Sequence, residues 1–322
     1  MAKNENLNAA KATKNDEFYT RLEDINAEMI HYEEHFKDKI IFMNCDDPEW
    51  SNFWRYFHLE FERLGLKKII STHYESGEVQ TYKLEYEGGD DMNFEAGTKT
   101  PLKQNGDFRS PECVELLKEA DIVITNPPFS IAREEFVPLL FEHKKDFLII
   151  GDLNWITYKN IFPLLKDNKM WLGYNSVKKF KEPDGSYRSF GNKTWFTNLD
   201  IKKRHEEIET TYLYSKKDEL YPELYPKYVN YDAIEISNIS TIPMDYEGVM
   251  GVPITFLCKH NPQQYIIVGN SLELCEKMSK IANKGEYMQG GVRPYIELKN
   301  GPYKYKRLYD RLFIKKIKKE SD

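Results

Sequence analysis

The segment Asp121–Thr125 (DIVIT) with Asn126–Phe129 (NPPF) directly after it decides the fold class of this chain. Its run of β-branched residues is typical of a buried strand. Helices are expected on either side, over Glu112–Ala120 and Ala132–Phe141, and Phe147–Gly151 (FLIIG) indicates the next buried strand. Strands that alternate with helices predict βαβ units and a parallel sheet.

The segments upstream follow the same alternation. A helix is expected over Asp16–Phe36, where apolar residues recur every three or four positions, and a buried strand over Lys39–Asn44. A second helix is expected over Phe53–Leu64, a second strand over Lys67–Ser71 and a hairpin strand over residues 79–87. The predicted fold is therefore α/β with a doubly wound, mostly parallel sheet.

The character of the sequence changes after residue 160. Phe180–Phe190 indicates a hairpin around Pro183-Asp184-Gly185, and Thr194–Thr197 indicates another strand. Tyrosines and prolines become frequent beyond residue 205, which indicates a more irregular α+β region. The expected organisation is a disordered N-terminus over residues 1–15, a first domain over residues 16–200 and a second over residues 201–322.

The composition excludes several classes of protein. Hydrophobic residues make up 40% of the 322 residues and charged residues 30%, which argues against a disordered chain. No apolar run approaches the roughly 18 residues that a membrane-spanning helix needs, and the N-terminus lacks the apolar stretch of a signal peptide. The four cysteines form no CxxC pair. A reducing, cytoplasmic compartment without a membrane partner is expected.

The net charge of −6 conceals an uneven distribution of charge. Residues 16–62 hold 13 acidic and 4 basic side chains, whereas residues 166–204 hold 10 basic and 4 acidic ones. Residues 301–322 hold 8 basic and 3 acidic side chains. Such basic segments suit a polyanionic partner, although solvated surfaces explain them equally well.

The tetrapeptide Asn126–Phe129 follows a predicted strand, at the sheet edge where ligands bind in open α/β folds. The asparagine side chain offers a carbonyl acceptor, and Pro127 offers a backbone carbonyl without an N–H. Pro127 and Pro128 stiffen the backbone, so that the two acceptors face one point. Phe129 adds a planar ring that can stack on a flat substrate.

An amino group conjugated to a ring suits this arrangement. Its nitrogen is a poor nucleophile because its lone pair is delocalised. Two acceptors that hold its two hydrogens favour pyramidal geometry and return electron density to the nitrogen, which can then attack an electrophile directly. Without its context, the tetrapeptide is also compatible with an ordinary turn after a strand.

Asn-Pro-Pro-Phe after such a strand resembles the catalytic motif of amino-methyltransferases that use S-adenosylmethionine (AdoMet). The ordered set of motifs resembles the EcoRI-type adenine-specific DNA methyltransferases over most of the chain. The motifs are Asp16–Thr20 (DEFYT), Asn44–Pro48 (NCDDP), Ser51–Phe53 (SNF), Gly106–Ser110 (GDFRS), Ala120–Ser130, Gly151–Asn154 (GDLN), Trp195–Leu199 (WFTNL) and Gly251–Leu257 (GVPITFL).

The resemblance implies methyl transfer from AdoMet to the N6 amine of an adenine flipped out of double-stranded DNA. Asn126 and the Pro127 carbonyl would hold the amine, and Phe129 would stack on the base. The residues implied in AdoMet binding are Phe18, Tyr19 and Thr20 at its methionine end, Cys45, Asp46 and Asp47 after the first strand, and Asp107 and Phe108 at its adenine.

Some of these residues have a second explanation. Asp46 and Asp47 also suit capping of the next helix, and Phe18 also continues an apolar helix stripe. The usual glycine-rich first loop is replaced by Cys45–Pro48, a feature that the EcoRI-type proteins share. The acidic residue that usually binds the cofactor ribose is not obvious, and Glu75 is the nearest candidate.

The resemblance further implies that residues 201–322 form a DNA target-recognition region. The candidates for contact with DNA phosphates or base edges are Lys178, Lys179, Lys181 and Arg188 beside the predicted hairpin, and Arg293 in the second domain. Each of them is equally compatible with a solvated side chain. A monomer or weak dimer is expected, with a cognate restriction endonuclease as a possible partner.

Two other functions share part of this pattern. An RNA adenine N6-methyltransferase would use the same tetrapeptide on structured RNA, and a non-catalytic DNA-binding protein could retain the fold. His31–His35 also fits the HxxEH pattern of a zinc-protease motif. The apolar stripe explains that helix as packing, so no metal site is expected.

Overall fold

The computed structural model describes residues 18–75, 77, 79–94, 96–182, 184–288 and 291–318, so the predicted disordered segment 1–15 lies outside it. The chain divides into two compact units. Unit 1 comprises Met1–Trp155 and Met170–Ile201, and unit 2 comprises Ile156–Lys169 and Lys202–Asp322. Residues 156–169, which lie within the range expected for the first domain, thus group with unit 2.

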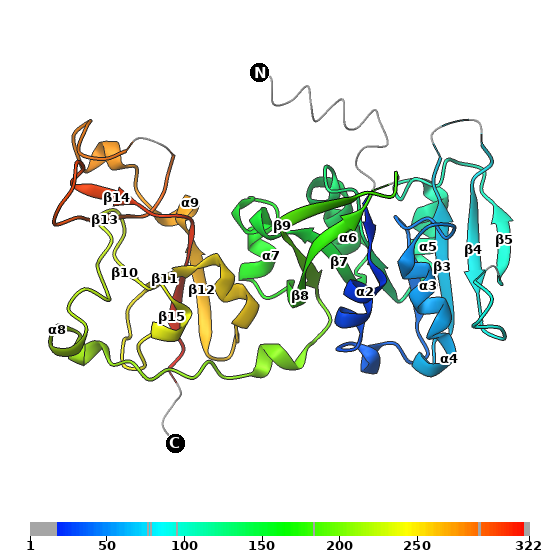
Figure 1. The fold of residues 1–322 in the computed structure, drawn as a ribbon, viewed down its shortest axis with the longest axis horizontal. Helices are drawn as coiled ribbons and strands as arrows, with labels where there is room; N and C mark the ends of the chain where they lie inside the picture. The colour runs from blue at the N-terminus through cyan, green and yellow to red at the C-terminus, as the bar shows by residue number, and fades with distance from the viewer. Residues whose placement is uncertain are drawn as a thin grey trace. The chain divides into compact units, whose positions relative to one another are not determined.

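Unit 1 is built on a nine-stranded sheet in the order β1-β8-β9-β7-β6-β2-β3-β4-β5 (Figure 1). Its strands are β1 (Tyr19–Thr20), β2 (Ile40–Met43), β3 (Lys68–His73), β4 (Tyr82–Tyr86), β5 (Thr98–Pro101), β6 (Ile122–Thr125), β7 (Asp146–Asp152), β8 (Trp171–Lys181) and β9 (Tyr187–Thr197). Its helices are α2 (Leu22–Met29), η1 (Glu33–His35), α3 (Asn52–Leu59), α4 (Phe61–Leu64), α5 (Pro111–Glu119), η2 (Ala132–Phe136) and α6 (Val137–Glu142), and η3 (Leu153–Thr157) follows β7.

The α/β class predicted from the sequence is confirmed, with parallel pairing confined to the centre of the sheet. The strands β7, β6, β2 and β3 run parallel to their neighbours in this group. The five outer strands pair antiparallel, so the sheet as a whole is mixed. Antiparallel neighbours need only a short connection, whereas parallel neighbours need a crossover such as a helix.

The strand order reverses at the middle of the sheet. From β2 the chain crosses to β3 on one side, and it later returns to β6 on the other side of β2. The register pairs Ile41 with Ile122 and Phe42 with Val123, so the carboxyl ends of β2 and β6 lie next to each other. In open α/β sheets, such a reversal leaves a crevice in which ligands bind.

Side chains of the parallel strands alternate between two covered faces. On one face, Ile41 and Ile124 join a buried cluster with Ile25 of α2 and Phe57 of α3. On the other face, Phe147 of β7 packs edge-on against Phe141 of α6, with ring centroids 5.7 Å apart. Because both faces are covered, these strands are continuous apolar runs rather than alternating ones.

The predicted helix over Asp16–Phe36 is wrong at both ends. Tyr19 and Thr20 pair with Lys181 and Phe180 of β8, so the hydrogen bonds of this segment belong to the sheet. The α-helix ends at Met29 and a separate 3₁₀ turn follows over Glu33–His35. Local periodicity predicted one helix, and strand pairing in the tertiary structure overrode it.

As a result, the two histidines of the HxxEH pattern do not share a helix face. His31 stacks on Tyr174 with ring centroids 3.8 Å apart. The His35 ring Nε2 lies 2.7 Å from the Asp200 carbonyl oxygen. Both rings are therefore used in packing unit 1.

Other boundaries also differ from the predictions. The helix over Phe53–Leu64 is interrupted at Glu60, and its end at Leu64 is confirmed because Gly65 adopts the left-handed conformation that closes a helix. The predicted hairpin over Phe180–Phe190 is confirmed, since it joins the end of β8 to the start of β9, and the strand expected over Thr194–Thr197 is the end of the same β9. The exposed strand Thr98–Pro101 was not predicted, since it carries no apolar pattern.

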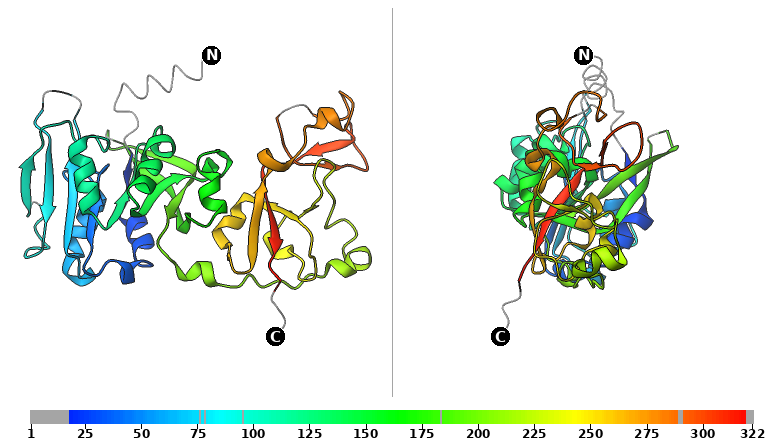
Figure 2. Two further views of the ribbon diagram at one scale, coloured as in Figure 1. Left: turned by 180° about the vertical axis from the view of Figure 1, so that it is seen from behind. Right: turned by 90° about the vertical axis from the view of Figure 1, so that its left-hand side faces the viewer.

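Unit 2 combines short strands with short helices (Figure 2). One sheet has the order β10 (Ile234–Glu235), β11 (Met250–Pro253), β15 (Arg311–Lys316), β12 (Tyr265–Asn270), and β13 (Tyr295–Glu297) pairs with β14 (Tyr305–Arg307). Its helices are α7 (Phe162–Lys166), η4 (Lys202–His205), η5 (Tyr214–Lys216), α8 (Lys217–Leu220), η6 (Ile239–Thr241), η7 (Ile254–Lys259), α9 (Ser271–Leu274) and η8 (Met278–Lys280). In the described part of the chain, no helix has the length and apolar character needed to cross a membrane.

A buried glutamate fastens the first helix of unit 1 to the sheet. Glu28 of α2 is fully buried, and its carboxylate accepts hydrogen bonds from Tyr174 N and Asn175 N, both at 2.8 Å. The Tyr32 hydroxyl donates to the same group at 2.9 Å. Burial raises the pKa of Glu28 above its ordinary value, against the effect of these donors.

Glu28→Ala should lower the free energy of unfolding by about 3 kcal/mol or more, because two buried backbone N–H groups and one hydroxyl would lose their acceptor. Glu28→Gln keeps one acceptor oxygen and should lose clearly less. Urea unfolding at pH 7, followed by tryptophan fluorescence, measures both variants. Equal stability of Glu28→Ala and the unmodified protein would contradict this role of the carboxylate.

Candidate active site

Three segments of unit 1 meet at the carboxyl ends of β2 and β6, and Asp46 joins two of them. Its carboxylate accepts hydrogen bonds from Asn126 N at 3.0 Å and from the Thr125 hydroxyl. Cys45 N donates to Thr125 Oγ1 at 3.2 Å. The loop after β2 and the tetrapeptide after β6 are thereby held in one arrangement.

Asp46 also supports the start of α3. It accepts from Ser51 Oγ at 2.9 Å, and Ser51 Oγ in turn accepts from Phe53 N at 3.0 Å as the cap of that helix. The two aspartates therefore do not cap α3 directly: Ser51 does, and Asp47 instead accepts from Glu49 N at 2.9 Å within the preceding turn.

Burial dominates the titration of Asp46. Its side chain is almost inaccessible, and this raises its pKa from 3.8 to about 6, although the hydrogen bonds from Thr125, Asn126 and Ser51 act in the opposite direction. Desolvation disfavours the charged carboxylate more than these donors favour it.

Asn126 has one end of its side-chain amide engaged and the other end open. Its Nδ2 donates to the Phe18 carbonyl oxygen at 2.5 Å, which brings the third segment, Phe18–Thr20, to the site. Its Oδ1 is buried and has no hydrogen-bond partner among the described residues. A buried acceptor of this kind is unfavourable unless a ligand supplies the missing donor.

Two further buried polar atoms near this point lack a partner within the described part of the chain. They are the side-chain nitrogen of Asn44, at the end of β2, and the hydroxyl of Thr20 in β1. Both can donate a hydrogen bond. The site therefore offers two donors and one acceptor to a polar ligand, at the crevice where the strand order reverses.

Phe129 lies in a cluster of phenylalanines. Its ring stacks on that of Phe18 with centroids 5.7 Å apart and an interplanar angle of 15°. The rings of Phe180 and Phe190, from β8 and β9, stand edge-on to it at 5.6 and 5.8 Å. Phe18 is thus both a core residue and a neighbour of the tetrapeptide, so its two predicted explanations are compatible.

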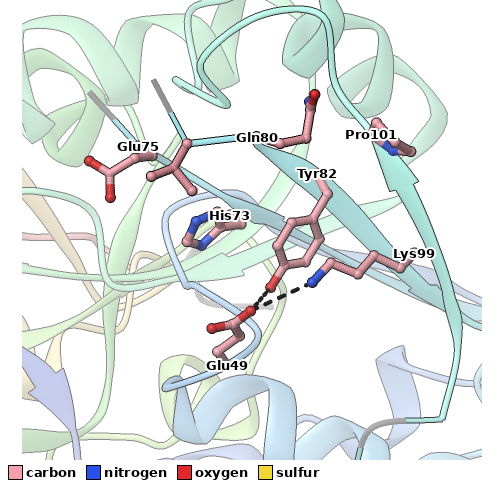
Figure 3. A pocket seen from close by; sticks show the side chains of 8 residues that line it. Glu49, His73, Glu75, Gln80, Tyr82, Lys99 and Pro101 are labelled. Atoms are coloured by element: carbon pink, nitrogen blue, oxygen red, sulfur yellow. Dashed lines mark hydrogen bonds and ion pairs between the residues drawn. The ribbon is translucent and has the colours of Figure 1, made fainter. Parts of the chain in front are cut away.

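A cavity of about 580 Å³ opens at the carboxyl end of β3 (Figure 3). His73, the last residue of β3, pairs through Nδ1 with Asp47 at 2.6 Å. Glu49 accepts from the Tyr82 hydroxyl at 2.5 Å and lies 3.6 Å from Lys99 Nζ, as the dashed lines in Figure 3 mark. The residues that line the cavity are Glu49, His73, Glu75, Val79, Gln80, Tyr82, Lys99 and Pro101.

The loop that carries Asp107 and Phe108 packs onto the same end of β3. Glu75 N donates to the Asn105 carbonyl at 3.1 Å. Gly106 has φ of +75°, and a Cβ atom at this position would collide with the carbonyl of His73. Only glycine combines this conformation with so close an approach, which explains its place in the GDFRS motif.

Asp107 is engaged by Arg109 through both of its oxygens, at 2.8 and 2.6 Å. Burial acts to raise the pKa of Asp107, but the hydrogen bonds and charge of Arg109 outweigh it and lower the pKa. Phe108 is buried and packs edge-on against Phe136, with centroids 5.1 Å apart. Arg109 thus orients the carboxylate that the resemblance implicates in cofactor binding.

The basic candidates fall in two places. Lys178, Lys179 and Lys181 are exposed on β8, and Arg188 on β9 pairs with Glu182 at 2.8 Å. The β8–β9 hairpin, green in Figure 2, extends away from the rest of unit 1. Arg293 belongs to unit 2, where its Nε lies 3.4 Å from Asp310.

Sequence reasoning missed several residues of the site. Ser51 and Thr125, which hold Asp46, lie inside quoted motifs but carry no chemical signal of their own. Asp152 pairs with Lys193 at 3.2 Å, and Lys193 Nζ lies 3.9 Å from the centre of the Phe129 ring. The GDLN motif indicated Asp152, whereas only the register of β9 identifies Lys193.

Across the described residues, no three or more His, Cys, Asp and Glu side chains gather closely enough to hold a metal ion. The buried polar atoms of the site without a partner among the described residues belong to two side-chain amides and one hydroxyl. These groups suit an organic ligand.

The fold and the site define an α/β enzyme of the amino-methyltransferase class, with Asn-Pro-Pro-Phe at the reversal of strand order and an open acceptor on its asparagine. Residues 6–317 match the family described as "Adenine-specific methyltransferase EcoRI". The chain belongs to this family, as the motifs predicted. It is an adenine-specific DNA methyltransferase, and its methyl donor is AdoMet.

Curated relatives match the chain over most of its length. It is 41% identical over 318 residues to the Type II methyltransferase M.EcoRI of Escherichia coli, covering 89% of this chain and 96% of the relative. It is 37% identical over 331 residues to M.MgeORF184P of Mycoplasma genitalium, covering 96% and 98%. It is 37% identical over 281 residues to M.MpnI of Mycoplasma pneumoniae, covering 81% and 84%. No solved structure matches the chain.

The raised pKa of Asp46 predicts how stability depends on pH. Between pH 3.8 and about 6, the folded protein retains a proton on this carboxyl that the unfolded chain has released. Asp46 alone should therefore make the free energy of unfolding fall as pH rises through this window, by up to about 3 kcal/mol.

Asp46→Asn removes the titrating group while keeping an acceptor oxygen. The stability of the unmodified protein minus that of Asp46→Asn should be larger at pH 4 than at pH 7, as measured by urea unfolding at both values. A difference that stays constant or grows with pH would contradict the raised pKa.

Proposed function

We propose that this chain methylates the N6 amine of an adenine that has been rotated out of double-stranded DNA at one short recognition sequence. The observation that carries the chemistry is the buried Asn126 Oδ1, which has no partner within the described residues and is fixed in place by the bond from Nδ2 to the Phe18 carbonyl. An exocyclic amine supplies the donor that this acceptor lacks.

The second acceptor in this proposal is the Pro127 carbonyl. The Pro128 carbonyl is committed to the following turn, since it accepts from Ile131 N at 3.2 Å and Ala132 N at 3.0 Å. Asn126 Oδ1 and the Pro127 carbonyl would hold both hydrogens of the amine and stabilise the charge that develops on its nitrogen. Preorganised acceptors of this type lower a barrier mainly through electrostatics and positioning.

When bound, AdoMet supplies an electrophilic methyl group on a positively charged sulfur. The residues present suit this cofactor. The open donors of Asn44 and Thr20 match a carboxylate at its methionine end, and the buried Asp46 provides negative charge. The remaining residues proposed for cofactor contact are Phe18, Tyr19, Cys45 and Asp47 near the methionine end, Asp107 and Phe108 at the adenine, and Glu75 at the ribose.

Phe129 is proposed to stack on the extruded adenine. Its ring is already held among Phe18, Phe180 and Phe190, so little side-chain freedom would be lost when a base arrives. Stacking contributes affinity for any base, whereas the two acceptors select one that carries an amino group at the right position.

Asn126→Ala should reduce methylation at least about 100-fold, because it removes one of two acceptors that act on the reacting nitrogen. AdoMet affinity should change little. Long-read sequencing that detects modified bases, on DNA from a methylation-free host expressing the chain, gives the substrate, the product and the recognition sequence together.

Asn26→Ala, which alters an exposed asparagine of α2, is the matched control and should leave methylation intact. Undiminished methylation by Asn126→Ala would contradict the proposed chemistry. Methylated RNA with unmodified DNA would favour the RNA methyltransferase. Unmodified nucleic acid and no AdoMet binding in a titration would favour a non-catalytic DNA-binding protein.

For DNA contact, we propose that the β8–β9 hairpin binds DNA phosphates and that residues 201–322 recognise the target sequence. Within that region, Arg293 would contact a base edge or a phosphate. Lys178, Lys179 and Lys181 are exposed on β8, the strand of this hairpin that pairs with β1. Phosphate contacts set the position of a protein on DNA without reading its sequence.

The triple variant Lys178→Ala, Lys179→Ala, Lys181→Ala should bind all DNA sequences more weakly. The slope of log affinity against log salt should fall by about 0.9 for each DNA phosphate that the variant no longer neutralises. Fluorescence anisotropy at several salt concentrations measures this. A triple variant of exposed lysines at the start of β2 and β3 (Lys37→Ala, Lys39→Ala, Lys67→Ala) is the control, and equal slopes in both variants would contradict the role of the hairpin.

The four cysteines carry free thiols, which supports a reducing, cytoplasmic location. Within that compartment, we propose a role in a restriction-modification system with a cognate endonuclease or in modification without one. A monomer or weak dimer can methylate each strand of a palindromic site in turn.

A further inference from the structure

A lysine is buried inside the phenylalanine cluster of unit 1. The side chain of Lys193 on β9 is only 7% exposed. Its Nζ lies 3.9 Å from the centre of the Phe129 ring and 5.3 Å from that of Phe190. A charged group at such a place is unfavourable unless it is paired, and an apolar side chain would fill the same space.

Asp152 provides the pairing charge. It is the last residue of β7 and lies opposite Lys193 in the sheet register, with Oδ2 3.2 Å from Nζ. Its other oxygen, Oδ1, accepts from Asn192 Nδ2 at 2.7 Å and from Asn154 N at 2.8 Å. Because both oxygens are held, the carboxylate fixes the ammonium in one position.

We propose that Lys193, anchored by Asp152, is a positioning residue that holds the Phe129 ring ready to stack on the flipped adenine. This inference rests on the proposed function. An ammonium over an aromatic face is attracted by the ring quadrupole, most strongly where water is excluded.

The geometry separates this role from catalysis itself. Nζ faces Asp152 and the Phe129 ring, whereas the proposed acceptors of the amine are Asn126 Oδ1 and the Pro127 carbonyl. Lys193 would therefore act on the base through Phe129. Losing the ammonium should weaken base stacking and the turnover that depends on it, and should leave AdoMet binding unchanged.

The test compares Lys193→Met, which keeps length without charge, with Lys193→Arg and Asp152→Asn. The control is Lys217→Met, since Lys217 also lies over a tyrosine ring and pairs with an aspartate, but in unit 2. The measurements are kcat, the Kd for AdoMet, and the fluorescence of 2-aminopurine at the target position, which rises when the base leaves the stack.

Lys193→Met should lower kcat about tenfold and reduce the 2-aminopurine signal, with the Kd for AdoMet within about twofold of the unmodified protein. Lys193→Arg should retain most activity, because a guanidinium also lies well on an aromatic face. Unchanged kcat and 2-aminopurine signal in Lys193→Met would overturn the inference, as would a loss of AdoMet binding parallel to the loss of activity.

A double-mutant cycle with Phe129→Ala shows whether Lys193 acts through this ring. Adding Lys193→Met to Phe129→Ala should cost less than about twofold in kcat, whereas independent effects would multiply. If Lys193→Met does not fold, the inference is tested with Lys193→Arg and Asp152→Asn. Full activity of Asp152→Asn would then overturn it. An unmodified protein that methylates no DNA contradicts the proposed function instead, so the two failures are distinguishable.

Discussion

The arrangement of the site depends on one buried carboxylate. Asp46 binds the start of α3 through Ser51, the end of β6 through Thr125, and the tetrapeptide that follows β6 through Asn126 N. The loop after β2 and the segment at the end of β6 are far apart in the chain and meet where the strand order reverses. Several donors surround this carboxylate and offset part of the cost of its burial, and those donors in turn acquire fixed positions. These hydrogen bonds hold the loop after β2 and the tetrapeptide in one arrangement.

Around this fixed point, the site is incomplete in ways that match its ligands. Asn126 Oδ1, Asn44 Nδ2 and the Thr20 hydroxyl are buried without partners among the described residues, which is unfavourable in the free protein. In the proposed function, substrate and cofactor supply the missing hydrogen-bond partners. In the same proposal, the aromatic cluster offers a flat surface that tolerates any base, next to acceptors that select an amine.

The features predicted correctly from the sequence are those whose pattern lies within one short segment. Thr125 to Phe129 were located because a β-branched strand and two prolines limit the backbone strongly. Gly106 was located only through the resemblance of its motif, and the structure shows that its conformation excludes a side chain. Tyr19 and Thr20 were assigned to a helix, since their pairing with β8 depends on residues some 160 positions away. The exposed strand β5 and the true length of β9 were missed for the same reason: their partners, rather than their own pattern, make them strands.

The sequence by itself determined the α/β class and the family, because these follow from short segments whose residue types leave few alternatives. Tertiary structure alone decided which groups meet. Only the register of β7 and β9 sets Lys193 against Asp152 and Phe129, and only the reversal between β2 and β6 sets Asp46 beside Asn126. Contacts between distant segments depend on strand order and on burial of the whole core, and no short stretch of sequence contains that information.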